Sequence, residues 1–266
     1  MSSPKSSGWS SSGPPEAPAP NFGLQARRYA AYRPTYPDEL YDRLIAAIGA
    51  PCRHAIDLGA GTGQATGDLL DRFDRVTAVE PDPAMGALIT ADARLEVRIM
   101  AAEDAVFREG AADAVVAATA LHWMDQDLMV RRAASWLRPG GGFLAFAYGP
   151  AKIVSPAHAE QEILRRFHDW RHNWHERLSA WRPYEGVLRD AGVFRSVNGF
   201  AVDVDFLWSG EETAGFFLST SYGSAFARGT GDEAAYGAAL ASALDAAAQH
   251  GLIHVRLPVE AALGIV

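Results

Sequence analysis

Segments with the residue pattern of strands and of helices alternate between His54 and Tyr148, and this alternation constrains the fold more than any other feature. The segment 112–120 (ADAVVAATA) is apolar over almost its whole length. A strand of a parallel sheet is buried on both faces and therefore shows such a continuous apolar run. The pattern predicts an α/β fold, a doubly wound and mostly parallel sheet with helices on both faces.

Seven strands are expected in this sheet. Five come from the alternating region, and they are HAIDLG, RVTAVE, LEVRIMA, ADAVVAATA and RPGGGFLAFAYG. Two more are expected near the C-terminus, FAVDVDFLW and LIHVRLPVEAALGIV, which are joined by helices and should lie at one edge of the sheet. Between the fifth and sixth strands, residues 151–192 predict an aromatic-rich helical insertion.

The sequence predicts a short N-terminal tail followed by one long domain. Residues 1–21 are rich in Ser and Pro and cannot bury enough apolar surface to offset the entropy of ordering, so we expect a disordered tail. Residues 22–266 are expected to form one domain, with a ligand-binding core (22–150), the insertion as a lid (151–192) and C-terminal strands and helices (193–266).

Composition excludes several classes of protein. A net charge of -8 disfavours a nucleic-acid partner, and the single cysteine leaves no internal disulfide. No apolar run approaches the roughly 18 residues of a membrane span, and the N-terminus lacks the apolar segment of a secretory signal. We therefore expect a soluble cytoplasmic protein without a membrane partner; its oligomeric state is not predicted.

A glycine-rich loop follows the first expected strand, in the stretch IDLGAGTGQATGDLL (residues 56–70). At the carboxyl end of a strand in an open parallel sheet, such a loop lies where ligands bind. The dinucleotide fingerprint G-x-G-x-x-G fails in both registers, because counting from Gly59 places Gln64 at the third glycine position and counting from Gly61 places Thr66 there. The loop therefore does not predict a pyrophosphate site.

Two acidic residues near this loop favour a cationic ligand instead. Asp57 lies just before the loop, and Glu80 ends the second strand. A carboxylate attracts an ammonium group, and an acid at the second strand end can accept hydrogen bonds from both ribose hydroxyls. S-adenosylmethionine combines a ribose, an α-ammonium and a sulfonium, and we expect it as cofactor, with S-adenosylhomocysteine as product. The alternative for Asp57 is that it organises the loop by bonding to backbone N–H groups.

Five motifs in this order and spacing resemble those of the class I S-adenosylmethionine-dependent methyltransferases, and they are DLGAGTG, VEPDPAM, AAEDA, LHWMD and LRPGG. The upstream YAAYRPTYP, together with LHWMD, is similar to the trans-aconitate methyltransferase-like branch of small-molecule enzymes. The resemblance covers residues 22–150 well and the remainder only in outline. It implies the Rossmann-like methyltransferase fold.

The resemblance also implies roles for residues at matching positions. In such enzymes the glycine loop and the strand ends hold the cofactor, which here implies Asp57, Gly59, Ala60, Gly61, Gly63, Glu80, Pro81, Met85, Ala102, Glu103, Thr119 and Ala120. Asp104 is an alternative to Glu103. Tyr29, Tyr32, Arg33 and Tyr36 resemble an N-terminal cap, with Tyr29 and Arg33 towards the cofactor and Tyr32 and Tyr36 towards the substrate. The alternative for Arg33 is that its guanidinium binds the carboxylate of the substrate. The alternative for all four residues is that they pack over the sheet edge.

His122 and Trp123 follow the fourth strand at its carboxyl end, where active-site residues collect. His122 is the one candidate catalytic residue, either as a base or as a group that positions the substrate. Trp123 is expected as a wall of the substrate pocket, with core packing as the alternative. An acceptor that is already ionised needs positioning and dehydration more than it needs a base.

The remaining candidates line the substrate pocket from the C-terminal half. They are Trp174 in the insertion, and Phe217 and Tyr222 in the stretch GFFLSTSY. His168 and His172 have the spacing of a metal pair on a helix, but no third ligand accompanies them, and we expect no metal.

We therefore expect methyl transfer from S-adenosylmethionine to a small molecule, most simply at a carboxylate or hydroxyl oxygen held in line with the methyl group. One alternative is a carbon or nitrogen acceptor in a natural-product intermediate, and a carbon acceptor would need a base. The other is a cofactor-binding module, or a cyclase or isomerase that does not methylate, on the same fold.

Overall fold

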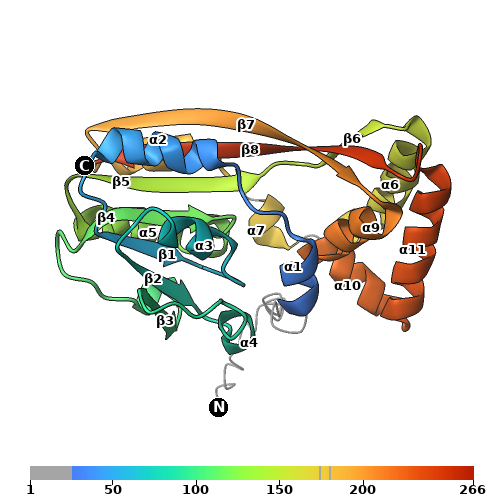
Figure 1. Cartoon of the computed structure of the whole chain (residues 1–266), viewed down its shortest axis with the longest axis horizontal. Coiled ribbons are helices and arrows are strands. Elements are labelled where there is room, and N and C mark those ends of the chain that lie inside the picture. The colour runs from blue at the N-terminus through green and yellow to red at the C-terminus, as the bar shows by residue number, and fades with distance from the viewer. Residues whose placement is uncertain (1–25, 174, 180) are drawn as a thin grey trace, which may run out of the picture.

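The computed structural model describes residues 26–173, 175–179 and 181–266, so the expected tail and Trp174 lie outside the described residues. In the described part, eight strands form one sheet in the order β3-β2-β1-β4-β5-β8-β6, with β7 paired to the other edge of β8 (Figure 1). Their bounds are β1 (His54–Leu58), β2 (Arg75–Glu80), β3 (Leu95–Ile99), β4 (Ala112–Ala118), β5 (Leu137–Tyr148), β6 (Lys152–Ser155), β7 (Ser196–Trp208) and β8 (Ile253–Ile265).

The expected fold class is confirmed. Strands β1 to β5 pair in parallel, and β8 runs antiparallel to β5 and β7. The strand beyond the expected seven is β6, whose four residues pair with β8 beyond the end of β5. The chain steps outward from β1 in both directions, to β2 and β3 on one side and to β4 and β5 on the other. The order therefore reverses between β1 and β4, which opens a crevice at their carboxyl ends.

Helices cover both faces of the sheet. On one face α2 (Asp38–Ile48) and α3 (Gln64–Leu70) bury apolar side chains against β1, β4 and β5. On the other face lie α5 (Gln126–Trp136) and α8 (Tyr184–Ala191). Helix α2 begins after Pro37 and ends at Gly49, and its buried residues Leu40, Leu44 and Ile48 recur at helical spacing. Helix α4 (Pro83–Gly86) follows β2 and has four residues.

Besides the hydrophobic clusters on the two faces of the sheet, a third cluster lies where β7 ends and β8 begins. It is built by α6 (Ala157–Trp170), α9 (Gly210–Leu218) and α11 (Glu233–Ala247), with α10 (Ser221–Gly229) packed among them. Figure 1 shows these helices gathered at one end of the molecule, with α1 (Ala26–Tyr32) beside α9. We call helices α6, α9, α10 and α11 the cap. They come from two separate segments of the chain, α6 from the first and α9 to α11 from the second. Helix α8, although part of the expected insertion, packs into the main core. No helix in the described ranges has the length and apolarity of a membrane span.

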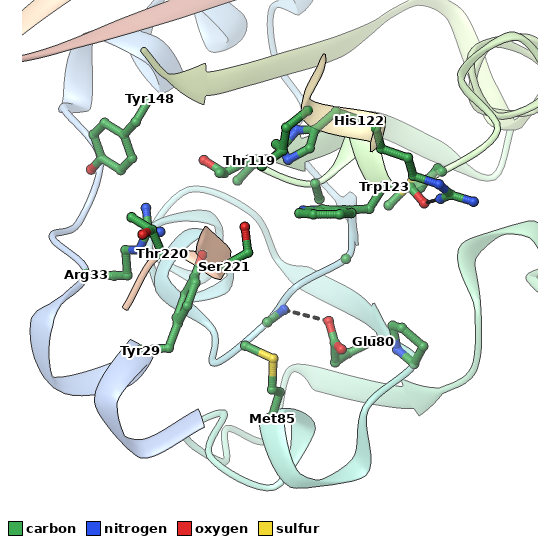
Figure 2. A pocket seen from close by; sticks show the side chains of 18 of the residues that line it. Tyr29, Arg33, Glu80, Met85, Thr119, His122, Trp123, Tyr148, Thr220 and Ser221 are labelled. Atoms are coloured by element: carbon green, nitrogen blue, oxygen red, sulfur yellow. Dashed lines mark hydrogen bonds between the residues drawn. The ribbon is translucent and has the colours of Figure 1, made fainter. Parts of the chain in front are cut away.

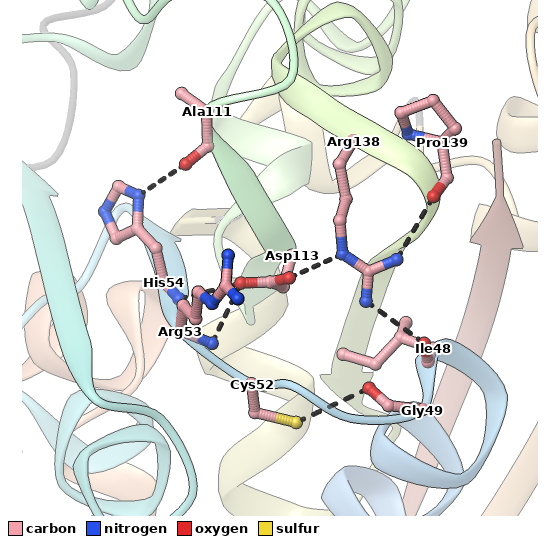
Figure 3. Close-up of polar contacts among 9 residues, drawn as sticks. All are labelled: Ile48, Gly49, Cys52, Arg53, His54, Ala111, Asp113, Arg138 and Pro139. Atoms are coloured by element: carbon pink, nitrogen blue, oxygen red, sulfur yellow. Dashed lines mark hydrogen bonds and ion pairs between the residues drawn. The ribbon is translucent and has the colours of Figure 1, made fainter.

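One buried carboxylate holds together the amino-terminal ends of the central strands, opposite the crevice. Asp113, at the start of β4, accepts hydrogen bonds from the backbone N–H groups of Arg53 and His54, each at 2.9 Å, and forms an ion pair with Arg138 (Figure 3). Arg138 also donates to the carbonyl oxygen of Ile48 at the end of α2. These contacts join the starts of β1, β4 and β5 and leave the opposite strand ends to form the site.

Candidate active site

A cavity of about 460 Å³ opens at the carboxyl ends of β1, β2, β4 and β5. Its walls come from the loops after these strands, from helix α1, from the helical cap, and from Arg177 and Leu178 in the chain between α6 and α8 (Figure 2). The glycine loop forms part of its floor through Gly59 and Gly61. The crevice predicted from strand order is therefore a real cavity, and sequence-distant segments close over it.

The glycine loop adopts backbone conformations that only glycine takes without strain. Gly59, Gly61 and Gly63 have φ values of +67°, +59° and +93°. A Cβ atom on Gly59 would lie 2.6 Å from the Cβ of Ala120. The backbone N–H groups of Gly59 and Ala60 both donate to the carbonyl oxygen of Val79, which ties the loop to β2. The loop thus presents bare backbone to the cavity, which lets a ligand approach closely.

Glu80 lies at the end of β2 on the cavity wall, with a relative exposure of 5%. Its two oxygens accept hydrogen bonds from the backbone N–H groups of Gly61 (2.8 Å) and Asp82 (2.9 Å). Burial raises the pKa of Glu80, although these two bonds oppose the shift. Each carboxylate oxygen can accept more than one hydrogen bond. The side chain is therefore held in place and keeps acceptor capacity for two hydroxyl groups of a ligand.

Asp57 lies beneath the loop and does not line the cavity. Its side chain is fully buried and accepts a 2.7 Å hydrogen bond from the Thr66 hydroxyl, while its second oxygen has no partner among the described residues. Burial raises its pKa to about 7. The hydrogen-bond partner of Asp57 among the described residues is thus the Thr66 side chain of α3 and not a backbone N–H group of the loop. Direct contact of Asp57 with a ligand ammonium group stays a prediction.

The opposite end of the cavity is positively charged. Arg33 lies on its wall, with its guanidinium 5.1 Å from the ring centre of Tyr29 and 5.2 Å from that of Phe216. Within the described ranges, no acidic side chain forms an ion pair with Arg33, and its buried Nε atom has no hydrogen-bond partner. Figure 2 shows Arg33 near Tyr148 and Thr220, across the cavity from Glu80 and Met85. The two ends of the cavity therefore carry opposite charge.

His122 and Trp123 form the wall between these ends, in the turn η3 (Leu121–Trp123) after β4. The His122 ring is 8% exposed, and its Nδ1 atom lies 2.9 Å from the Tyr184 hydroxyl. Burial, and secondarily the charge of Arg33, lower the pKa of His122 to about 4. His122 is therefore neutral and only weakly basic at neutral pH.

Residues 56–145 match the family model described as a methyltransferase domain. This segment of the chain is similar to a methyltransferase domain. An uncharacterised methyltransferase of Mycobacterium tuberculosis is 38% identical over 122 residues, which are 46% of this chain and 49% of that protein. The chain spans about half the length of the curated relatives it matches.

Two solved structures extend the similarity beyond this domain. A protein of Anaeromyxobacter dehalogenans, described as a type II methyltransferase, is 26% identical with a TM-score of 0.70, covering 88% of this chain and 98% of that chain. A Haemonchus contortus phosphoethanolamine N-methyltransferase, in complex with phosphomonomethylethanolamine and S-adenosylhomocysteine, is 14% identical with a TM-score of 0.52, covering 90% of this chain and 57% of that chain. The second likeness concerns the fold alone.

Most residues expected at the cofactor side of the methyltransferase domain line the cavity. These are Gly59, Gly61, Glu80, Pro81, Met85, Ala102, Glu103, Thr119, Ala120, Tyr29 and Arg33. Ala60 and Gly63 belong to the same loop but do not line the cavity. Glu103 lines it, but its side chain also accepts a 2.9 Å hydrogen bond from the backbone N–H of Asp125, so it is partly engaged before any ligand binds.

Only some of the residues expected on the substrate side line the cavity. Trp123 and Tyr222 line the cavity, whereas Tyr32, Tyr36 and Phe217 do not. The Tyr32 ring packs on Gly215 of α9, and its hydroxyl donates to Glu211. Phe217 points into the third cluster towards Trp170, because adjacent residues of a helix point about 100° apart. Its neighbour Phe216 takes the cavity position.

Tyr36 lies one layer behind the cavity wall. Its hydroxyl is 2.9 Å from the Thr119 hydroxyl, and its ring stacks on that of Tyr148 with centres 5.0 Å apart. Thr119 itself has a φ of +52°, which is rare for a residue with a branched side chain. Tyr36 thus supports two cavity-lining residues, Thr119 and Tyr148, without lining the cavity itself.

Several cavity residues escaped prediction from sequence, and they are Met124, Tyr148, Arg177, Leu178, Phe216 and Thr220. Tyr148 ends β5, so its strand-end position was an available signal. Arg177 and Leu178 belong to α7 (Glu176–Ser179), where Arg177 donates to the carbonyl oxygen of Trp123.

In the described part of the chain, no three His, Cys, Asp or Glu side chains gather as a metal site.

Proposed function

We propose that the chain transfers a methyl group from S-adenosylmethionine to a small molecule that carries a carboxylate or hydroxyl oxygen. The observation that carries this proposal is the division of charge across one cavity. Glu80 is fixed at one end, and Arg33 lies at the other without an acidic partner in the described ranges. A cationic cofactor suits the first end, and an anionic acceptor suits the second.

The residues at the acidic end fit the cofactor. Glu80 has acceptor capacity for the two ribose hydroxyls, and Gly59 and Gly61 leave space that a Cβ atom would fill. Met85 and Ala102 add apolar surface beside Glu80, which suits an adenine ring. When bound, S-adenosylmethionine would supply a methyl group on a sulfonium, which reacts with an electron-rich oxygen.

The residues at the basic end fit an ionised acceptor. Arg33 can bind a carboxylate with two parallel hydrogen bonds. The aromatic rings of Tyr29, Tyr148 and Phe216 around it limit water, which would otherwise solvate the acceptor oxygen. An ionised oxygen needs no base, and this agrees with the low pKa of His122. The similarity of LHWMD to the trans-aconitate methyltransferase-like branch supports the same choice.

A screen of acceptors tests the proposal. The full chain is incubated with S-adenosylmethionine and a panel of small carboxylic acids, alcohols, amines and carbon nucleophiles, and products that gain one methylene are sought by mass spectrometry. We expect methyl esters from one class of acid. The proposed function is wrong if amines or carbon nucleophiles are the substrates, or if the cofactor's demethylated product sustains turnover.

The substitution Arg33→Gln distinguishes acceptor binding at the basic end of the cavity from cofactor binding at the acidic end. Losing a charged hydrogen-bond partner costs about 1.5–3 kcal/mol, so we expect the KM for the acid to rise roughly 10- to 100-fold. The KM for S-adenosylmethionine should stay the same. Arg43→Gln, on the exposed face of α2, is the matched control. Equal effects of both variants, or no effect of Arg33→Gln on the acid, would contradict the assignment.

A further inference from the structure

Tyr184 joins the helical segment after β6 to the candidate active site. It begins α8, is 3% exposed, and packs into the main core against α5. Its hydroxyl lies 2.9 Å from Nδ1 of His122, a residue 62 positions earlier in the chain. His122 lines the cavity and is 8% exposed. The contact therefore ties the orientation of a cavity-wall imidazole to a buried phenol.

The direction of this hydrogen bond follows from the burial of the Tyr184 hydroxyl. Tyr184 is 3% exposed, and the hydrogen-bond partner of its hydroxyl is Nδ1 of His122, at 2.9 Å. A phenol carries one hydrogen, and leaving a buried donor without an acceptor costs free energy. If Nδ1 donated to the phenol oxygen, the phenol hydrogen would lose this acceptor. Tyr184 is therefore the donor, and Nδ1 accepts.

The tautomer of His122 follows in turn. A neutral imidazole carries one proton, and when one ring nitrogen accepts a hydrogen bond the proton lies on the other. Burial and the nearby charge of Arg33 keep His122 neutral at physiological pH. With Nδ1 directed at Tyr184, Nε2 is the ring nitrogen left for the cavity.

We propose that Tyr184 is a positioning residue that holds His122 with its proton on Nε2, so that His122 offers the cavity a hydrogen-bond donor and not a base. This rests on the proposed function only in treating the cavity as the acceptor site. A donor on this wall complements Arg33, because both favour an oxygen that carries negative charge.

The test is the tautomer of His122 in the full-length, ligand-free protein, measured from long-range ¹H–¹⁵N correlations of the imidazole nitrogens. The signal is assigned by its loss in His122→Gln. We expect wild type to show the Nε2–H form. Tyr184→Phe keeps the packing but removes the donor, and we expect the Nδ1–H population to rise several-fold.

Tyr41→Phe is the matched control, because it removes another fully buried phenol oxygen on the opposite face of the sheet. We expect it to leave the His122 tautomer unchanged. A wild-type spectrum with the proton on Nδ1 would overturn the proposal, even if Tyr184→Phe did not fold. An unchanged tautomer in a folded Tyr184→Phe variant would also overturn it. The measurement uses neither cofactor nor acceptor, so its failure is distinguishable from failure of the proposed methyl transfer.

Discussion

Asp57 and His122 show how burial sets the charge of single residues in this domain. Both side chains lie close to the carboxyl ends of the central strands, where little water reaches them. Burial disfavours the charged form, and it therefore raises the pKa of the acid to about 7 and lowers that of the histidine to about 4. Both groups thus tend towards neutrality, and the charge of the cavity comes from its charged lining residues, Glu80, Glu103, Arg33 and Arg177.

Asp57 makes stability depend on pH in a defined direction. The folded protein keeps its Asp57 proton up to about pH 7, whereas the unfolded chain loses it near 3.8. Between these values the folded state binds more protons, so its stability falls as pH rises. Asp57→Asn keeps an acceptor for Thr66 and has no proton to lose.

We expect the free energy of unfolding of wild type, relative to Asp57→Asn, to fall by about 2–4 kcal/mol between roughly pH 4.5 and pH 7.5. Urea denaturation at a series of pH values measures this difference. His122 acts in the opposite direction over part of this range, but it is present in both proteins and cancels. A difference that does not change with pH would show that Asp57 is ionised throughout.

At the scale of elements, the sequence predicts order along the chain better than contacts across it. The apolar runs and the glycine loop identified β1 to β5, because strand burial and positive φ leave local signatures. Phe216 and Phe217 are both apolar, and only the packing of α9 decides which one faces the cavity. Tyr148 donates hydrogen bonds from its hydroxyl to the carbonyl oxygens of Pro34 and Thr35, more than a hundred residues earlier in the chain. These contacts, which hold its side chain at the cavity, have no local signature in the sequence.

The glycine loop provides a sharp test at this scale. Gly59→Ala places a Cβ atom 2.6 Å from that of Ala120 at a φ of +67°, so we expect a loss of at least about 1–2 kcal/mol of stability and much weaker S-adenosylhomocysteine binding. Gly67→Ala, in α3, meets no atom within 4 Å and should stabilise by about 0.5–1 kcal/mol. Thermal unfolding and calorimetry measure both. Equal behaviour of the two variants would rule out the close-approach role of Gly59.

At the scale of the whole molecule, the site lies where the sheet meets a separately packed cap. The end of the cavity that holds Glu80 rests on loops of the sheet, whereas Phe216, Thr220 and Tyr222 reach the cavity from α9 and the start of α10. The cap has its own hydrophobic cluster and meets the sheet chiefly through β6, β7 and β8. This arrangement predicts that the cap can open without unfolding of the central strands.

Leu244→Ala tests that independence. Leu244 lies fully buried in α11, so its truncation should cost the cap about 2–5 kcal/mol. We expect hydrogen exchange to accelerate in α6, α9 and α11 and to remain slow in β1 and β4. Leu144→Ala, in β5 of the main core, should accelerate exchange throughout the sheet. Equal acceleration of β1 and α11 in the Leu244 variant would mean that cap and sheet unfold as one unit.

The most direct measurement for the whole account is calorimetry of S-adenosylhomocysteine and NAD⁺ with wild type, Glu80→Gln and the exposed control Glu109→Gln. We expect wild type and the control to bind S-adenosylhomocysteine equally and not to bind NAD⁺. We expect Glu80→Gln to bind S-adenosylhomocysteine about 10- to 100-fold more weakly, the loss expected when polar groups are left unpaired. Unchanged affinity in Glu80→Gln, or tighter binding of NAD⁺ than of S-adenosylhomocysteine, would contradict this account.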